Sequence, residues 1–240
     1  MSLSGAVQLF PRDILAESTS AKEMPVGTLG QTTDGRKFRY CKAGASALAA
    51  GKLAVASTIV ANHENVTVQT AAAIGATKVT VTLGATAATA DQYTDGYMVV
   101  NDVTGEGITY RISGNPAADS AATLEVSLHD EIVVALTTSS QVTLLANPWN
   151  GAVISASDQA DMAVGVAPRE ITAAYYGWIQ THGVCAGLAD ETLAVGSSLT
   201  IGSSVGGAFE VKDGAGEQDL GTAIQAGVDT EYRAVYLSID

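Results

Sequence analysis

From about residue 37 onward, short runs of alternating apolar and polar residues predict an all-β chain. No long stretch repeats apolar residues at the spacing of an amphipathic helix. The clearest run is 77–83, TKVTVTL, in which Val79, Val81 and Leu83 fall on one face of a strand. The intervening lysine and threonines fall on the other face. We therefore expect a strand with one buried face and one solvated face.

Three further segments repeat this alternation, and each places its apolar residues on a single face. Their apolar positions are Ile108, Tyr110 and Ile112, then Leu124, Val126 and Leu128, and finally Val142 and Leu144. Together with 77–83 they predict a compact antiparallel unit. An alanine-rich stretch at 71–76 and a turn cluster at 147–151 bound this unit, so we expect an inserted antiparallel β domain at 65–147.

The segments on either side of this region resemble one another. Upstream, Cys41 leads through Leu-Ala-Ala-Gly at 48–51 to Leu53. Downstream, Cys185 leads through Leu-Ala-Val-Gly at 193–196 to Leu199. A strand, a glycine turn and a second strand, used twice, would explain the similarity, and so would the shared Ala, Gly and Leu composition. The first explanation predicts that 36–64 and 148–240 form one β-barrel or β-sandwich domain.

Residues 1–35 show little periodicity, because prolines and glycines interrupt any regular element. We expect an extended N-terminal arm that is disordered or becomes ordered on a neighbouring subunit. The apolar side chains that it could bury on docking are Leu9, Phe10, Ile14 and Leu15.

Residues 171–183, ITAAYYGWIQTHG, gather three aromatic side chains in a chain that is only 5% aromatic. Strand alternation places Tyr176 and Trp178 on one face, as a core or subunit anchor, and Tyr175 on the opposite surface. With the apolar residues of the arm, they complete the candidate interface with a partner subunit, which comprises Leu9, Phe10, Ile14, Leu15, Tyr175, Tyr176 and Trp178.

Charge narrows the classes of partner. Only 15% of the residues are charged, so either partner subunits cover much of the surface or serine and threonine solvate it. The net charge of −13 argues against a nucleic-acid partner, because phosphate binding requires an excess of basic residues. No apolar run approaches the roughly 20 residues of a membrane span, so we expect no membrane partner.

The candidate catalytic residues carry little chemistry. Gly202–Gly206, GSSVG, matches a nucleophile elbow, but the strand-like residues that follow and the lack of any later histidine favour a hairpin turn at Ser204. Cys41 and Cys185 read as two small buried thiols. The three histidines, His63, His129 and His182, lack metal-ligand spacing and read as structural. We therefore expect no catalytic residues, no cofactor and no metal.

One acidic loop leaves an alternative open. Asp213, Glu217 and Asp219 alternate with glycines and could seat a calcium ion, since hard cations take several oxygen ligands from flexible loops. Their spacing matches no standard calcium loop, and a solvated hairpin tip is the favoured interpretation.

Several segments resemble phage structural proteins. The run TAAYYGWIQTHG at 172–183, with 193–196, 221–224 and 234–237, resembles the C-terminal part of head decoration proteins of tailed bacteriophages. The segments 35–40 and 48–53 look like the N-terminal part of such proteins. The segments 75–89 and 101–107 are similar to structural proteins of marine phages. These motifs are structural rather than catalytic.

The resemblance implies a non-enzymatic cement protein, often a trimer, that binds the major capsid protein on the outer surface of an icosahedral head. Such a protein assembles in the host cytoplasm and stays on the virion. An acidic chain suits the outer surface, since it would keep virions apart. The alternatives are a tail, fibre or minor head protein, a carbohydrate-binding adhesive β module and, least favoured, a hydrolase that uses Ser204.

Overall fold

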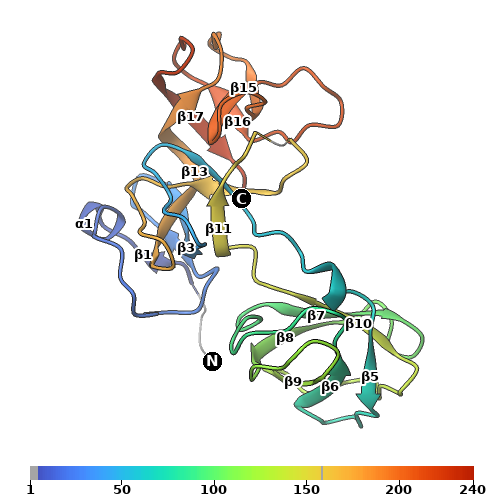
Figure 1. Cartoon of the computed structure of the whole chain (residues 1–240). Coiled ribbons are helices and arrows are strands. Elements are labelled where there is room, and N and C mark those ends of the chain that lie inside the picture. The colour runs from blue at the N-terminus through green and yellow to red at the C-terminus, as the bar shows by residue number, and fades with distance from the viewer. Residues whose placement is uncertain (1–4, 158) are drawn as a thin grey trace. The chain divides into compact units, whose positions relative to one another are not determined.

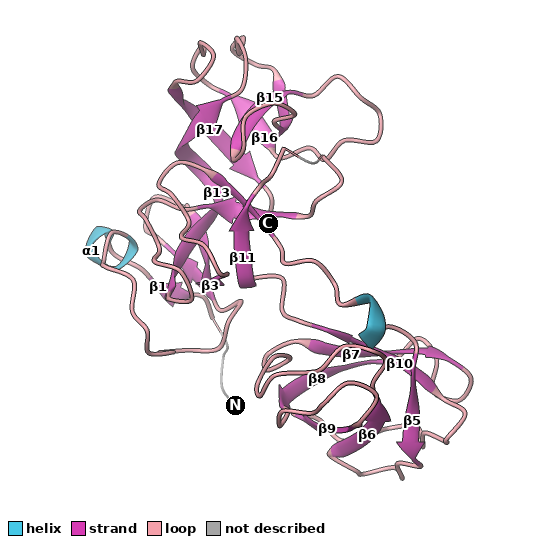
Figure 2. Ribbon diagram, viewed as in Figure 1, coloured by secondary structure: helices cyan, strands magenta, loops and turns pink. Residues whose placement is uncertain are grey.

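The computed structural model describes residues 5–157 and 159–240 and confirms the all-β class (Figures 1 and 2). Its helical elements are α1 (Pro11–Ile14) and the 3-10 helix η1 (Ala61–His63). The chain divides into two compact units. The inserted unit is Thr58–Asn147, and the outer unit combines the described residues up to Ser57 with Pro148–Asp240. Among the described residues, no helix is long and apolar enough to cross a membrane.

The inserted unit is a closed antiparallel barrel with the strand order β10-β5-β6-β9-β8-β7. Its strands are β5 (Val66–Thr70), β6 (Lys78–Thr82), β7 (Tyr97–Asp102), β8 (Thr109–Gly114), β9 (Thr123–Leu128) and β10 (Gln141–Leu145). The four segments expected from alternation form β6, β8, β9 and β10. Val79 and Val81 lie in the barrel core while Lys78 and Thr82 are exposed, as the pattern predicts.

A buried histidine ties the start of the inserted unit to its barrel. His63 is fully buried at the end of η1, where Nε2 lies 2.9 Å from the carbonyl oxygen of Thr86 and Nδ1 contacts the hydroxyl of Tyr93. Because a carbonyl only accepts, Nε2 carries the proton and Nδ1 accepts from Tyr93. Burial raises the pKa of Tyr93 to about 12. The unit therefore begins before residue 65.

The outer unit contains eleven hydrogen-bonded strands. They are β1 (Val7–Gln8), β2 (Leu29–Gln31), β3 (Lys37–Ala43), β4 (Leu53–Val55), β11 (Asn150–Ile154), β12 (Ala163–Val166), β13 (Tyr176–Ala189), β14 (Ser198–Ile201), β15 (Ala208–Val211), β16 (Gly221–Ala223) and β17 (Tyr232–Ser238). Their pairings close two rings that share β13. One ring is β3-β11-β4-β12-β13 and the other is β13-β15-β14-β16-β17.

Strand β13 serves both rings because its direction changes near its middle. The register with β3 shifts between Gln180 and His182, and Gly183 adopts a φ of +87°. The buried amide of Gln180 donates to the carbonyl oxygens of His182 at 3.0 Å and Val184 at 2.9 Å, which stabilises the bend. A Cβ on residue 183 would lie 2.9 Å from Cγ of Arg36, so both conformation and space favour glycine.

One loop design recurs in both units. Pairs of loop residues exchange reciprocal backbone hydrogen bonds. Each of these residues, numbered i, is followed by a β-turn in which the amide of residue i+4 donates to the carbonyl oxygen of residue i+1. The pairs are Leu48 with Ile171, Leu193 with Gly227, Ala72 with Leu136, and Ala88 with Ala118. In seven of these eight turns the third residue after the bridge has a positive φ, namely Gly51, Gly75, Asp91, Ala121, Ala174, Gly196 and Thr230. The similar 48–51 and 193–196 sequences are two of these turns.

Candidate functional site

The N-terminal segment folds back onto its own outer unit. Leu9 and Ile14 are buried with Phe38, Tyr40 and Trp178 in one apolar cluster. We expected both residues to be disordered or to bury against a neighbouring subunit, and here the structure differs. Burial within the chain removes their apolar surface from water without a partner.

Hydrogen bonds hold this segment along β13 and the loop before it. Thr19 and Tyr176 exchange backbone hydrogen bonds of 3.1 and 2.8 Å. Arg169 donates from Nη1 to the carbonyl oxygen of Leu15 at 2.7 Å, and the amide of Thr172 donates to Oγ of Ser18 at 3.0 Å. The segment is therefore fixed at several points by groups from residues 169–176.

Close packing reinforces this attachment. Residue 30 in β2 is a glycine, and a Cβ there would lie 2.4 Å from Cδ1 of Leu9 and 2.8 Å from the ring of Trp178. Only a residue without a side chain lets Leu9 reach the indole.

Three aromatic rings form the centre of the cluster. Tyr40 stacks on Tyr176 with centroids 5.8 Å apart and meets the Trp178 ring edge-on at 5.4 Å. Register explains the contact, because Trp178 lies directly opposite Tyr40 in the β3–β13 pair. Nζ of Lys42 lies 5.5 Å from the Tyr176 centroid, within cation–π range. Burial raises the pKa of the Tyr40 hydroxyl.

The predicted interface residues therefore separate into two groups. Leu9, Ile14 and Trp178 are buried together with Tyr176 beside them, so Tyr176 and Trp178 share a face as expected. Phe10, Leu15 and Tyr175 are exposed, Phe10 by 49% and Leu15 by 52%. Sequence reasoning missed Tyr40 and Phe38, although alternation in 37–43 would have placed both on one face.

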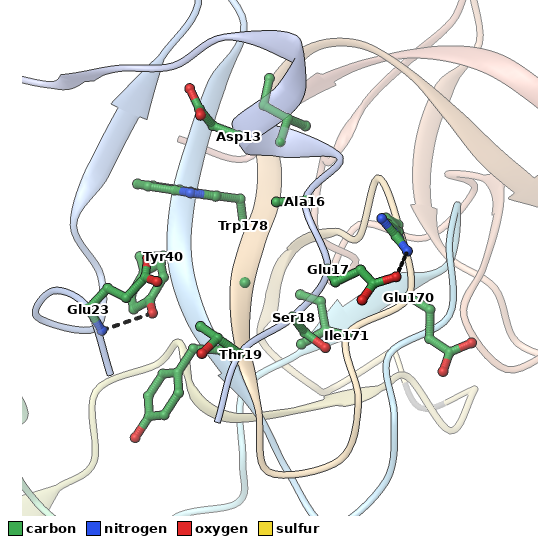
Figure 3. A pocket seen from close by; sticks show the side chains of 14 residues that line it. Asp13, Ala16, Glu17, Ser18, Thr19, Glu23, Tyr40, Glu170, Ile171 and Trp178 are labelled. Atoms are coloured by element: carbon green, nitrogen blue, oxygen red, sulfur yellow. Dashed lines mark hydrogen bonds and ion pairs between the residues drawn. The ribbon is translucent and has the colours of Figure 1, made fainter. Parts of the chain in front are cut away.

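A pocket of about 110 Å³ opens where the N-terminal segment crosses β13 (Figure 3). Apolar and aromatic side chains line its interior, namely Ile14, Tyr40, Ile171, Tyr176 and Trp178. Charged side chains also line it, namely Asp13, Glu17, Glu23, Arg169 and Glu170. The pocket thus combines aromatic rings with a predominantly acidic lining.

The sequence analysis did not predict a second exposed apolar surface, which lies on β13 and β17. On the outer side of the second ring, Val184 lies opposite Tyr236, and Ala186 lies opposite Ala234. Val184 is 48% exposed and Tyr236 is 41% exposed. We call these four residues, with the exposed Ile224 next to Ala234, the β13–β17 face. The sequence did contain a signal for this surface, because β17 carries apolar residues on both of its sides. Val235 and Leu237 on one side fill the core, and Ala234 and Tyr236 lie on the other side.

The GSSVG segment forms the turn between antiparallel β14 and β15, so the predicted hairpin turn is confirmed. The amide of Ser204 donates to Oδ2 of Asp190 at 2.8 Å, and Oγ of Ser203 donates to Oε2 of Glu210 at 2.7 Å. A strand follows the turn where an elbow would need a helix. These contacts stabilise a turn.

The two cysteines and the acidic loop were the remaining candidates for a reactive thiol or a metal site. Both cysteines are free thiols, and burial raises the pKa of Cys41 strongly and that of Cys185 to about 12. In the acidic loop, Oε2 of Glu217 accepts from the amide of Asp213 at 3.1 Å. Within residues 5–157 and 159–240, no group of three or more His, Cys, Asp or Glu side chains could hold a metal ion.

Comparison with known proteins identifies no relative. No protein-family model matches the chain, and neither a curated protein nor a solved structure shows significant similarity to it. The surfaces described above are therefore the basis for inferring function. They comprise the pocket, the exposed residues of the N-terminal segment and the β13–β17 face.

Proposed function

We propose that this protein is a structural virion protein that binds the outer surface of a tailed-phage capsid and stabilises the lattice of the major capsid protein. On this proposal it acts as a homo-oligomer, with a trimer as the expected state. The sequence resemblance is the reason for proposing this family, and the β13–β17 face is the structural observation that supports a role in assembly.

The β13–β17 face has the properties of a contact surface. Its apolar side chains project from two directly paired strands, so their positions are fixed before any partner arrives. Covering them with a partner would remove apolar surface from water, which contributes about 25 cal/mol of binding free energy per Å² buried. Because the paired backbone is already ordered, binding here requires no further ordering of the main chain. Contiguous exposed apolar residues on a sheet are typical of protein interaction sites.

The charge of the chain is compatible with an outward position. A net charge of −13 on each of many copies would give the particle a strongly negative exterior. Like charge keeps particles apart in solution. The same charge would be unfavourable on a surface that faces packaged DNA.

Binding to capsids tests the proposal directly. Purified full-length protein is mixed with expanded empty heads built from the major capsid protein encoded with this chain, and co-sedimentation is measured over a range of concentrations. We expect saturable binding and a higher melting temperature of the heads. Absence of saturable binding to heads would overturn the proposal, and binding to tails alone would assign the protein to the tail.

Variants test the surface. Val184→Glu and Tyr236→Glu place charges on exposed positions and should weaken head binding or oligomerisation without unfolding the chain. Ile74→Glu is the matched control, because Ile74 is also exposed but lies in the inserted unit. Light scattering should give a mass about three times that of the 24.4 kDa chain. Equal binding by the wild type and both β13–β17 variants would exclude this face from the contact.

A further inference from the structure

The pocket beside the aromatic cluster has a chemical character that the proposed function does not use. Its interior presents the rings of Tyr40, Tyr176 and Trp178, with Ile14 and Ile171 beside them. Figure 3 shows that the N-terminal segment supplies Asp13, Glu17 and Glu23, whereas Glu170 comes from the loop before β13. Two separate parts of the chain thus build one acidic, aromatic pocket.

The pocket lining carries four carboxylates and one guanidinium. The guanidinium of Arg169 is already engaged, because it donates to the carbonyl oxygen of Leu15 and pairs with Glu17 at 3.1 Å. Asp13 is also engaged, since its carboxylate accepts from the amide of Phe10 at 2.8 Å. The pocket therefore has a surplus of negative charge that its own cation does not neutralise.

Two carboxylates remain free for a ligand. Among the described residues, the side chains of Glu23 and Glu170 take part in no hydrogen bond or ion pair, although both line the pocket. The backbone amide of Glu23 donates to the hydroxyl of Tyr40 at 3.2 Å, which holds Glu23 next to the aromatic rings. Both residues are exposed, and Glu23 is the one held beside a ring. A free carboxylate beside an aromatic ring attracts a cation and repels an anion.

We propose that this pocket binds one basic side chain, from a lysine or an arginine, of a protein partner. The ammonium or guanidinium group meets Glu23 beside the rings, and the negative charge of Glu170 on the other side of the pocket adds attraction at longer range. The methylene stem packs on the aromatic rings. Lys42 already lies over one of these rings at cation–π distance, so the cluster accommodates a cation. A volume of about 110 Å³ accepts the end of one long side chain rather than a folded element.

Charge complementarity favours a basic side chain over a neutral one as the ligand of this pocket. A neutral apolar side chain would bury part of the acidic rim without pairing it, which costs free energy. The net charge of −13 also attracts a basic partner over a longer range and raises its association rate. This inference stands apart from the capsid assignment, because a failure of head binding would leave the chemistry of the pocket unchanged.

The test uses small probes and the full-length chain. Nα-acetyl-lysine methylamide and Nα-acetyl-arginine methylamide are titrated while amide and indole NMR signals are followed. The neutral control is Nα-acetyl-norleucine methylamide, which has a similar length and no charge. We expect either basic probe to shift the Trp178 indole and Gly177 amide signals saturably, and norleucine to leave them unchanged. No saturable shift with either basic probe, or equal shifts with norleucine, would overturn the proposal.

A matched pair of variants locates the binding. The double substitution Glu23→Gln and Glu170→Gln keeps the shape of both side chains and should weaken binding of the basic probe by roughly twofold to thirtyfold, as expected for the loss of one direct and one longer-range interaction with exposed charges. Glu106→Gln with Glu131→Gln removes the same charge from exposed positions in the inserted unit and should have little effect. Equal weakening by both pairs would show that only net charge matters and would refute the pocket.

Discussion

Gly196 occupies the positive-φ position of one of the recurrent β-turns that follow the hydrogen-bonded loop pairs. We therefore predict that Gly196→Ala destabilises the outer unit through backbone conformation alone. Gly196 has a φ of +89°, and a Cβ there would meet nothing within 4 Å. A residue with a Cβ pays about 1–2 kcal/mol in this left-handed region. Reduced freedom of the unfolded chain returns about 0.4–1 kcal/mol. We therefore expect a net loss of about 1 kcal/mol.

Gly51→Ala in the equivalent turn should cost more. Its φ of +71° carries the same conformational penalty, and the new Cβ would lie 2.6 Å from the ring of Tyr232. Tyr232 is 48% exposed, so its ring can turn aside, and this displacement adds about 0.5–1.5 kcal/mol. The expected order of stability is therefore wild type, Gly196→Ala and then Gly51→Ala.

Gly216→Ala is the matched control for both substitutions. Gly216 also has open space around its Cα, but its φ lies outside the left-handed region. Alanine should leave stability unchanged or raise it slightly there. Thermal unfolding monitored by calorimetry measures all three, and about 1 kcal/mol corresponds to a shift of roughly 2–4 °C in this size range. If Gly196→Ala and Gly216→Ala melted at the same temperature, positive φ would not be the cause and the reasoning would be refuted.

Two further predictions concern buried and paired polar groups. His63→Ala removes the partner of the Tyr93 hydroxyl and the Thr86 carbonyl in the core, so the inserted unit should lose about 2–4 kcal/mol of unfolding free energy. Denaturant unfolding followed by Tyr93-sensitive circular dichroism measures this loss. A loss under about 1 kcal/mol would contradict the prediction. The hydrogen bond from Arg39 lowers the pKa of Asp240 below its usual 3.8, so the pair stabilises the fold above that pH and the gain disappears as the pH falls through the folded-state pKa. Arg39→Gln should therefore flatten the acid side of the stability curve, and an unchanged slope below pH about 4 would argue against the pairing.

Local patterns in the sequence were enough to find strands and their buried faces. In β6 each residue alternates sides, so the sequence itself separates Val79 and Val81 from Lys78. The same rule placed Tyr176 and Trp178 on one face of β13. It could not identify Tyr40 as their partner, because the β3–β13 pairing joins positions more than a hundred residues apart.

The pocket shows the same division. Its aromatic residues and the apolar N-terminal residues stand out in the sequence as groups that must be buried. Apolar character sets the free energy gained by burial but not the surface that supplies it. The contact with Trp178 instead of a neighbouring subunit depends on the space at Gly30 and on the hydrogen bonds of Thr19 and Arg169.

The sequence by itself determined the all-β class, the alternating strands of the inserted unit, the hairpin turn at Ser204 and the residues that needed burial. Those properties follow from period-two alternation and turn chemistry, which act between neighbours in the chain. Only the tertiary structure decided that β13 bends at Gln180 to close two rings and that the N-terminal segment covers its own sheet. Only it brought Glu23 and Glu170 to one aromatic pocket, because long-range strand pairing and packing set these positions.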